Sequence, residues 1–204
     1  MLDARGQLVD IKSKKIYETA SRVGFLDPIT KLPPRDERSI SALLCIYHQQ
    51  GKIDWAKVPL LDAKCQQIEL TAEAVLGQPG ILCSEYTLFW ATKSECNAYG
   101  DMRPDFLYIA SGDETAAIIE NKLGAGDTHK RDHYGGQFGR YIQYLKQASA
   151  KNKYMILLTS KCYLPESVPG YASQLQLAEK LQRSAASIRS VIICWEDVLG
   201  AFAK

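Results

Sequence analysis

Two carboxylates and an ammonium fall within one short stretch of the chain, RPDFLYIASGDETAAIIENKL at positions 103–123. They are Asp105, Glu120 and Lys122. Carboxylates that approach each other repel unless a cation lies between them. A hard divalent cation such as Mg²⁺ binds oxygen ligands at about 2.0–2.1 Å and keeps several waters, so two acids can hold it. An ammonium beside such an ion can orient or deprotonate an attacking water, or neutralise charge on a phosphate. These residue types indicate metal-assisted hydrolysis, provided that the fold brings them together.

A β-hairpin would bring the three side chains together. Gly112-Asp113 is a two-residue loop of the Gly-X type, and if it forms the turn, Asp105 lies directly opposite Glu120. Opposed residues share a sheet face, with Cβ atoms about 5 Å apart. Lys122 shares this face because it is two residues from Glu120. A loop one residue longer would shift the pairing but leave the groups close.

A simpler alternative is that Glu120 and Lys122 form an exposed charge pair on a solvated face. This is the more common arrangement in a generic hairpin, because short motifs match by chance. The apolar run AAII, at positions 116–119, instead favours a strand that is covered on both sides.

The N-terminal part of the chain is predicted to be helical. Residues 12–24 can form a short helix, and the proline-rich stretch LDPITKLPPRDE that follows is typical of a linker. In DERSISALLCIYHQQG, at positions 36–51, apolar residues recur at i, i+3, i+4 and i+7, which is one helix face. A second helix is predicted at 60–76. We therefore expect a helical extension and linker over residues 1–35 and one domain over residues 36–204.

Predicted strands dominate the rest of the chain. They cover 85–93, 105–110, 114–123, 154–160 and 190–195. The predicted helices cover 137–147, 171–187 and 195–203. This order predicts an α/β fold with a mixed central β-sheet flanked by helices, in which an antiparallel meander comes first and parallel strands follow.

Composition sets broad limits on the function. The chain has 204 residues, 46% hydrophobic and 24% charged, which is an ordinary balance for one globular domain. A net charge of +2 does not indicate a nucleic-acid binder, but it leaves room for a local basic patch. No apolar signal segment opens the chain and no run approaches the roughly 18 residues that span a bilayer. The six cysteines form no CxxC pair. We expect a cytoplasmic protein without membrane contact, with buried reduced thiols.

Three motifs in a fixed order resemble the PD-(D/E)xK nuclease superfamily: RPD, then ENK, then Gln-x-x-x-Tyr. The resemblance is closest to the branch with an IENK motif, and Gln137 and Tyr141 supply the last motif here. DERSISALLCIYHQQG resembles the family's first core helix, and YMILLTS and ICWEDVLGAF resemble its later elements. The resemblance covers roughly residues 36–201. One three-residue motif is weak evidence, whereas independent motifs in the required order are stronger.

The resemblance implies a restriction-endonuclease-like core that binds Mg²⁺ or Mn²⁺. Asp105 and Glu120 would bind the ion, together with the peptide carbonyl of Asn121. Lys122 would position or activate the attacking water. Glu37 matches the family's helical acid, which contacts a second metal or its water shell.

Two further points depend on the same resemblance. Glu85 and Glu95 compete with Glu37 for the role of the additional acid, and Glu37 is preferred because it begins an amphipathic helix. Gln137 and Tyr141 match the helix motif that supports the site in exonuclease-like members. They are four residues apart and therefore share one helix face.

A local basic patch follows the hairpin, since residues 120–153 hold seven Lys and Arg against three acids. A solvated helix face would explain this patch alone, but beside a phosphate-cleaving site it suits nucleic acid. His129 and His133 are spaced as in a zinc helix, yet they lack the Glu of HExxH and a third ligand. The predicted nucleic-acid contacts are Lys130, Arg131, Arg140 and Lys146.

Together these features predict a Mg²⁺- or Mn²⁺-dependent nuclease that hydrolyses DNA, in restriction, phage defence or DNA processing. A homodimer would suit double-strand cleavage. Two alternatives remain open: a non-catalytic nucleic-acid-binding module of the same fold in a larger complex, and a nuclease directed at RNA. The chain has no GxGxxG, P-loop or GxSxG motif, so nucleotide hydrolysis and serine-hydrolase chemistry have no support.

Overall fold

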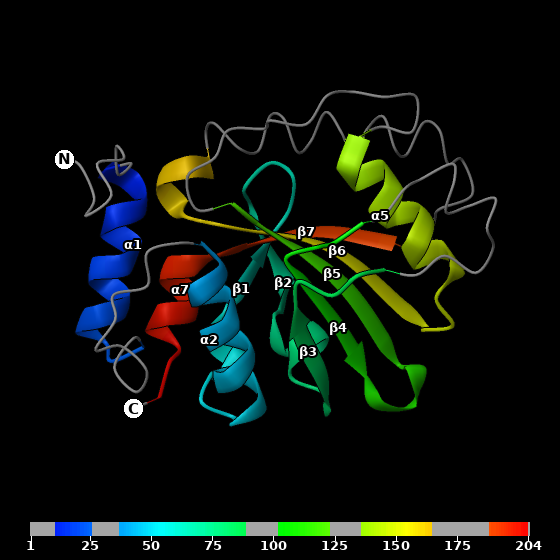
Figure 1. The fold of residues 1–204 in the computed structure, drawn as a ribbon, viewed down its shortest axis with the longest axis horizontal. Helices are drawn as coiled ribbons and strands as arrows, with labels where there is room; N and C mark the ends of the chain where they lie inside the picture. The colour runs from blue at the N-terminus through cyan, green and yellow to red at the C-terminus, as the bar shows by residue number, and fades with distance from the viewer. Residues whose placement is uncertain (1–10, 26–36, 89–101, 123–135, 165–187, 204) are drawn as a thin grey trace.

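A seven-stranded β-sheet forms the centre of the protein (Figure 1). The structure, a computed structural model, describes residues 11–25, 37–88, 102–122, 136–164 and 188–203. The strand order across the sheet is β2-β1-β7-β6-β5-β4-β3. The strands are β1 Pro59–Leu61, β2 Gln67–Thr71, β3 Gly80–Ser84, β4 Phe106–Ala110, β5 Thr115–Lys122, β6 Asn152–Thr159 and β7 Ile188–Cys194.

The sheet combines the two kinds of strand pairing that the sequence predicts. β3, β4 and β5 form an antiparallel meander, whereas β5, β6 and β7 run parallel. Parallel neighbours require a crossover connection, and α5 (Gly136–Gln147) lies in the chain between β5 and β6. On the other side, β1 pairs antiparallel with both β7 and β2. The α/β class and the mixed sheet flanked by helices are therefore confirmed.

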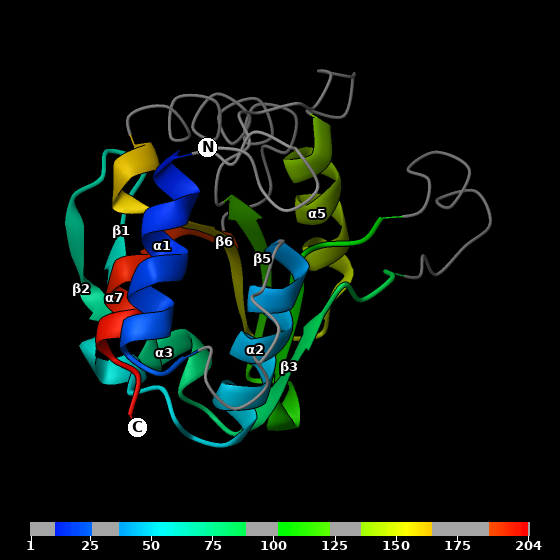
Figure 2. The same ribbon diagram turned by 60° about the vertical axis from the view of Figure 1, so that its left-hand side comes forward.

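Helices cover both faces of the sheet (Figures 1 and 2). On one face, α1 (Ile11–Arg22), α2 (Glu37–Gln49) and α7 (Trp195–Gly200) contribute to a large apolar core. On the other face, α5 packs with the sheet in a second core. The remaining helical elements are η1 Trp55–Lys57, α3 Glu73–Leu76, η2 Ser111–Asp113 and η3 Lys161–Tyr163.

Strand β6 shows why its sequence is continuously apolar. Tyr154, Ile156 and Leu158 point into the core beneath α2 and α7, whereas Met155 and Leu157 point into the core beneath α5. A strand between two helical layers needs apolar side chains on both faces. The prediction of buried strands here is confirmed.

The helix predicted at 60–76 is wrong, because this segment forms the hairpin of β1 and β2, followed by the single turn of α3. The Asp62 carboxylate accepts hydrogen bonds from the backbone N–H groups of Lys64 and Gln66, at 2.8 and 2.9 Å. An Asp that bonds nearby backbone in this way stabilises a turn against a helix. Ile68 and Leu70 then pack on the core two residues apart, which is the strand period.

The first strand of the meander lies earlier than predicted. This strand is β3 at 80–84, whereas the sequence predicts a strand at 85–93. Within 85–93, Leu88 forms an isolated bridge to Met102, and residues 89–93 lie outside the described part. Gly80 belongs to the strand because β4 passes very close to it. A Cβ atom at this position would lie 2.6 Å from the carbonyl oxygen of Ile109. The glycine therefore marks a close backbone approach and not only a loop.

The N-terminal helix packs into the main core. Ile16, Ala20 and Phe25 are buried there, and the Phe25 ring meets those of Trp195 and Phe202 edge-on. The predicted linker at 26–36 and the predicted helix at 171–187 lie outside the described residues.

Two narrower expectations can be compared with the described residues. None of the helices there is long and apolar enough to cross a membrane. Cys45 and Cys194 are buried, as expected for core thiols, but Cys65 is exposed, so the expectation of buried thiols is wrong for that residue. Cys65 lies in the tight β1–β2 turn with a φ of 61°, which carries it out of the core.

Candidate active site at the Asp105–Glu120 hairpin

The β4–β5 hairpin has the register that places Asp105 opposite Glu120. The last pair in the ladder is Phe106 with Ile119, so the next position along brings the two acids together. The connecting loop differs from the predicted two-residue turn, because the 3₁₀ turn of η2 and the residue after it separate the strands. Gly112 and Asp113 both have positive φ, at 71° and 56°, which lets the longer loop close without changing the register.

Glu120 is buried and is surrounded by hydrogen-bond donors. Only 3% of its surface is exposed. Lys122 Nζ donates to Glu120 Oε1 at 2.6 Å. Gln137 Nε2 lies 3.1 Å from both carboxylate oxygens, and the Tyr141 hydroxyl donates to Oε2 at 3.3 Å. The alternative that Glu120 and Lys122 form an exposed charge pair on a solvated face is therefore wrong. Glu120 lies under α5, and the Lys122 side chain is only 17% exposed.

Helix α5 holds the donors in place through its apolar face. Phe138, Tyr141, Ile142 and Leu145 are buried against the sheet, and this fixes the rotation of the helix about its axis. Gln137 and Tyr141 are one turn apart, and both reach the same carboxylate. The structure therefore brings both residues of the predicted helix motif to Glu120.

The amide of Gln137 has a defined orientation. A carboxylate can only accept hydrogen bonds when ionised, so the Nε2 group must face Glu120 and Oε1 must face elsewhere. Oε1 is buried and accepts no hydrogen bond from the described residues. This oxygen is an acceptor available to a water or a ligand group at the site.

Asp105 is fixed by backbone contacts on two sides. Its Oδ2 accepts the backbone N–H of Asn121 at 2.7 Å, and its carbonyl accepts the N–H of Glu85 at 2.9 Å. Burial, then the charge of Glu120, raise the pKa of Asp105 to about 7, although the hydrogen bond from Asn121 and the charge of Lys122 oppose the rise. Two acids that compete for negative charge in a buried place are suited to a cation.

Asn121 faces the other side of the sheet. Its Oδ1 accepts from Trp195 Nε1 at 2.8 Å, and its Nδ2 donates to Ser41 Oγ at 3.2 Å. All three side chains are buried, so the strand that carries Glu120 is tied to α2 and α7. Sequence reasoning assigned a metal contact to the carbonyl of Asn121 but missed Ser41 and Trp195. Nothing in the local sequence links positions 41, 121 and 195.

The additional acid is only partly defined. Glu37 is the first residue of α2, but its side chain lies outside the described part, as does the whole of Glu95. Glu85 directly follows β3 with a φ of 50°, and its charge adds to the rise in the pKa of Asp105. Among the described acids, Glu85 is therefore the one placed beside the pair. The choice of Glu37 stays a prediction.

The predicted nucleic-acid contacts are distributed unevenly around α5. Lys130 and Arg131 lie outside the described residues, as do the two histidines at 129 and 133. Arg140 is half-buried, three residues after Gln137. Lys146 is nine residues after Gln137, which puts it half a turn round the helix and about 13 Å along it. The structure does not bring Lys146 to the carboxylates.

The carboxylate oxygens of Asp105 and Glu120 are the type of ligand that a hard divalent cation binds, but two side chains do not complete its coordination shell. No group of three or more acidic, histidine or cysteine side chains that could hold a metal occurs among the described residues. Mg²⁺ commonly binds through one or two carboxylates, with waters and substrate phosphates completing its shell. Asp105 and Glu120 meet that requirement, and Lys122 now neutralises Glu120 in the place where a metal would act.

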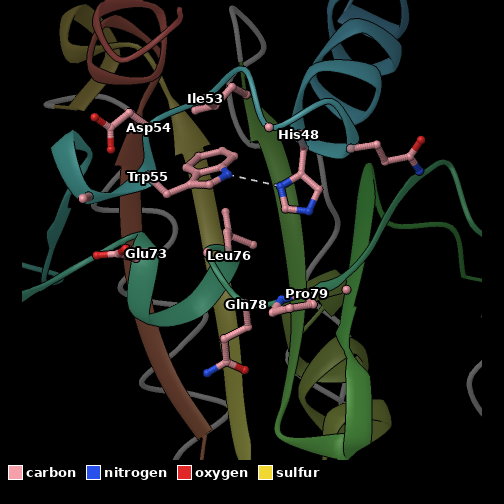
Figure 3. A pocket seen from close by; sticks show the side chains of 13 residues that line it. His48, Ile53, Asp54, Trp55, Glu73, Leu76, Gln78 and Pro79 are labelled. Carbon is pink, nitrogen blue, oxygen red and sulfur yellow. Dashed lines mark hydrogen bonds between the residues drawn. The ribbon is translucent and has the colours of Figure 1, made fainter.

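A separate pocket of about 390 Å³ lies at the C-terminal end of α2 (Figure 3). Within it, Trp55 Nε1 donates to His48 Nδ1 at 3.1 Å, and burial lowers the pKa of His48. Gly80 lines this pocket and pairs with Ala110 of β4, five residues from Asp105. At about 3.3 Å per residue the pocket is roughly 17 Å from the carboxylates, so it is not part of this site.

Comparison of the chain with protein-family models, with curated proteins and with solved structures finds no match. The assignment of a function therefore depends on the sequence motifs and on the geometry described above.

Proposed function

We propose that the protein is a metal-dependent nuclease of the PD-(D/E)xK type that hydrolyses DNA phosphodiester bonds. The observation that carries this proposal is the buried Glu120 carboxylate, which lies opposite Asp105 and is contacted by Lys122, Gln137 and Tyr141. A structural ion pair would need no second acid with a raised pKa beside it. A hydrolytic metal site uses both acids and the lysine.

The arrangement of the sheet supports the same proposal. An amphipathic helix, an antiparallel meander, a helix and a parallel strand occur in this order as α2, β3–β5, α5 and β6, with η1, the β1–β2 hairpin and α3 inserted between α2 and β3. This is the order expected of a restriction-endonuclease-like core. The two acids lie close to the start of β4 and the end of β5, which are neighbouring antiparallel strands.

The proposed roles follow from the contacts. Asp105 and Glu120 would hold Mg²⁺ or Mn²⁺, which supplies a polarised phosphoryl oxygen and a bound water of lowered pKa. Lys122, released from Glu120, would orient the attacking water or neutralise the phosphate. Gln137 and Tyr141 hold the Glu120 carboxylate in one orientation, because both bond to it from a rigid helix.

The proposal is tested by incubating the protein with linear, circular and single-stranded DNA in Mg²⁺, Mn²⁺ or EDTA, with RNA in parallel. We expect cleavage that requires the metal and is lost in Glu120→Gln. Ile81→Ser, an exposed change on β3 away from the acids, is the matched control and should cleave normally. Binding of DNA without cleavage in any metal would favour the non-catalytic module, and cleavage of RNA alone would redirect the substrate assignment.

A further inference from the structure

A cavity of about 330 Å³ lies between α5 and the sheet, on the face that carries Glu120. Its walls are mostly apolar: Leu107, Ile109 and Ala116 come from the sheet, and Tyr144 and Leu145 come from α5. Small-molecule sites have volumes of about 300–1,000 Å³. A cavity of about 150 Å³ holds benzene, so this one has room for a larger flat ring system.

The cavity is in line with the two carboxylates. Leu107 and Ile109 are two and four residues from Asp105 on the same face of β4, or about 7 and 13 Å along the strand. On α5, Tyr144 follows Gln137 by seven residues, which is two turns and the same flank of the helix. A strand with a phosphate at the carboxylates would reach the cavity within a few nucleotides, since even the short ~3.4 Å rise of stacked B-form DNA requires no more than about four.

The lining suits one class of group, a nucleobase. Tyr144 lines the cavity. Tyr86 is near Tyr144, since its charge adds to the effect of burial in raising the pKa of the Tyr144 hydroxyl. Aromatic side chains stack on bases of any sequence. Polar side chains of Asp113, Gln147 and Ser149 also line the cavity, where they can pair with the edges of a base.

We propose that this cavity binds an unpaired nucleobase of the strand whose phosphate lies at Asp105 and Glu120. A base enters an enclosed pocket only after it has left its stack and its partner. The substrate class is therefore single-stranded DNA or the frayed end of a duplex, in preference to a paired interior. This inference rests on the proposed nuclease function, which it makes more specific.

The test measures binding of the full chain in EDTA, so that no metal-dependent cleavage interferes. The probes are a fluorescein-labelled oligothymidylate, an abasic strand of the same length and a blunt duplex, each followed by fluorescence anisotropy. The variants are Tyr144→Ala and Ile109→Ser. The control is Ile81→Ser, because Ile81 pairs with Ile109 across the strands and is even more exposed (61% against 46%) but does not line the cavity.

We expect the oligothymidylate to bind more tightly than the abasic strand or the duplex. Tyr144→Ala should weaken oligothymidylate binding about 5- to 100-fold, the range that loss of one stacked base gives. It should leave abasic binding unchanged, and Ile81→Ser should alter neither. If Tyr144→Ala does not fold, Ile109→Ser decides, because this exposed position tolerates the change.

Equal affinity for the oligothymidylate and the abasic strand would overturn the proposal, and so would unchanged affinity in the cavity variants or absence of binding to any strand. Cleavage of DNA by the wild type in Mg²⁺ separates the two hypotheses. Cleavage without any dependence on bases would leave the nuclease assignment intact and refute the base pocket. Base-dependent binding without cleavage would support the pocket and count against the nuclease.

Discussion

Asp105 should make the metal-free protein less stable as the pH rises. Its pKa is raised from 3.8 to about 7 in the folded protein. The folded state therefore binds this proton more tightly than the unfolded state does between these two values, so the free energy of unfolding falls as the pH rises through that range. About three units at roughly 1.4 kcal/mol each give a loss of up to ~4 kcal/mol, of which ~3 kcal/mol falls between pH 5 and pH 8.

Asp105→Asn should remove this pH dependence. The amide oxygen of asparagine can still accept the N–H of Asn121, so the main contact of the side chain is preserved. Urea unfolding in EDTA at pH 5 and pH 8 should show the variant gaining ~3 kcal/mol relative to wild type at the higher pH. For a chain of this length each kcal/mol corresponds to about 2–4 °C in Tm.

Addition of Mg²⁺ at pH 8 should cancel most of the variant's gain in stability. A ligand at one hundred times its Kd stabilises the folded state by about 2.7 kcal/mol, and only the wild type retains both acids. A difference between wild type and variant that is identical at pH 5 and pH 8 and insensitive to Mg²⁺ would refute both the buried competition of the two acids and the metal site built on it.

Four further outcomes follow from the contacts. Lys122→Ala should abolish or severely slow DNA cleavage while calorimetry shows Mg²⁺ binding largely retained, because lysine is not a ligand; lost Mg²⁺ affinity would contradict its role. Gln137→Ala should lower turnover at saturating DNA more than it changes KM, since Gln137 contacts Glu120. Asn121→Ala should lower the free energy of unfolding by about 2–4 kcal/mol in urea titrations, because two buried polar groups lose their partner. Arg140→Ala should reduce the slope of log binding constant against log salt concentration for DNA by about one unit, and Lys146→Ala by less. The reason is that, of these two residues, only Arg140 is near the flank of α5 that carries Gln137, and equal effects would contradict this placement.

The sequence predicts the position of Asp105 opposite Glu120 better than it predicts the elements that precede the hairpin. The predicted register of β4 and β5 follows from a short loop centred on Gly112-Asp113, and the observed register is the same although the turn differs. The segment at 60–76 forms a hairpin and a single helical turn instead of the predicted helix. The side chain of Asp62, which bonds the backbone two and four residues on, decides in favour of a hairpin.

Long-range contacts set the limit of such predictions. At Gly80 the need for glycine comes from the backbone of β4, which lies too close for a Cβ atom. Ser41 and Trp195 are unremarkable in sequence, and each acquires its role only when the fold brings it to Asn121. Motifs within one hairpin can be read along the chain, but contacts between distant elements cannot.

The ENK motif shows how one strand serves two purposes. Because side chains alternate across a strand, Glu120 and Lys122 face α5, and Asn121 between them faces the opposite core. The side chain of the middle residue therefore points away from the two carboxylates and joins α2 and α7 to the strand. Its backbone N–H still bonds Asp105, so the same residue also sets the position of the second acid. A substitution of Asn121 should thus displace Asp105 as well as loosen the core. These contacts explain why Asn121, the middle residue of the motif, is buried and hydrogen-bonded.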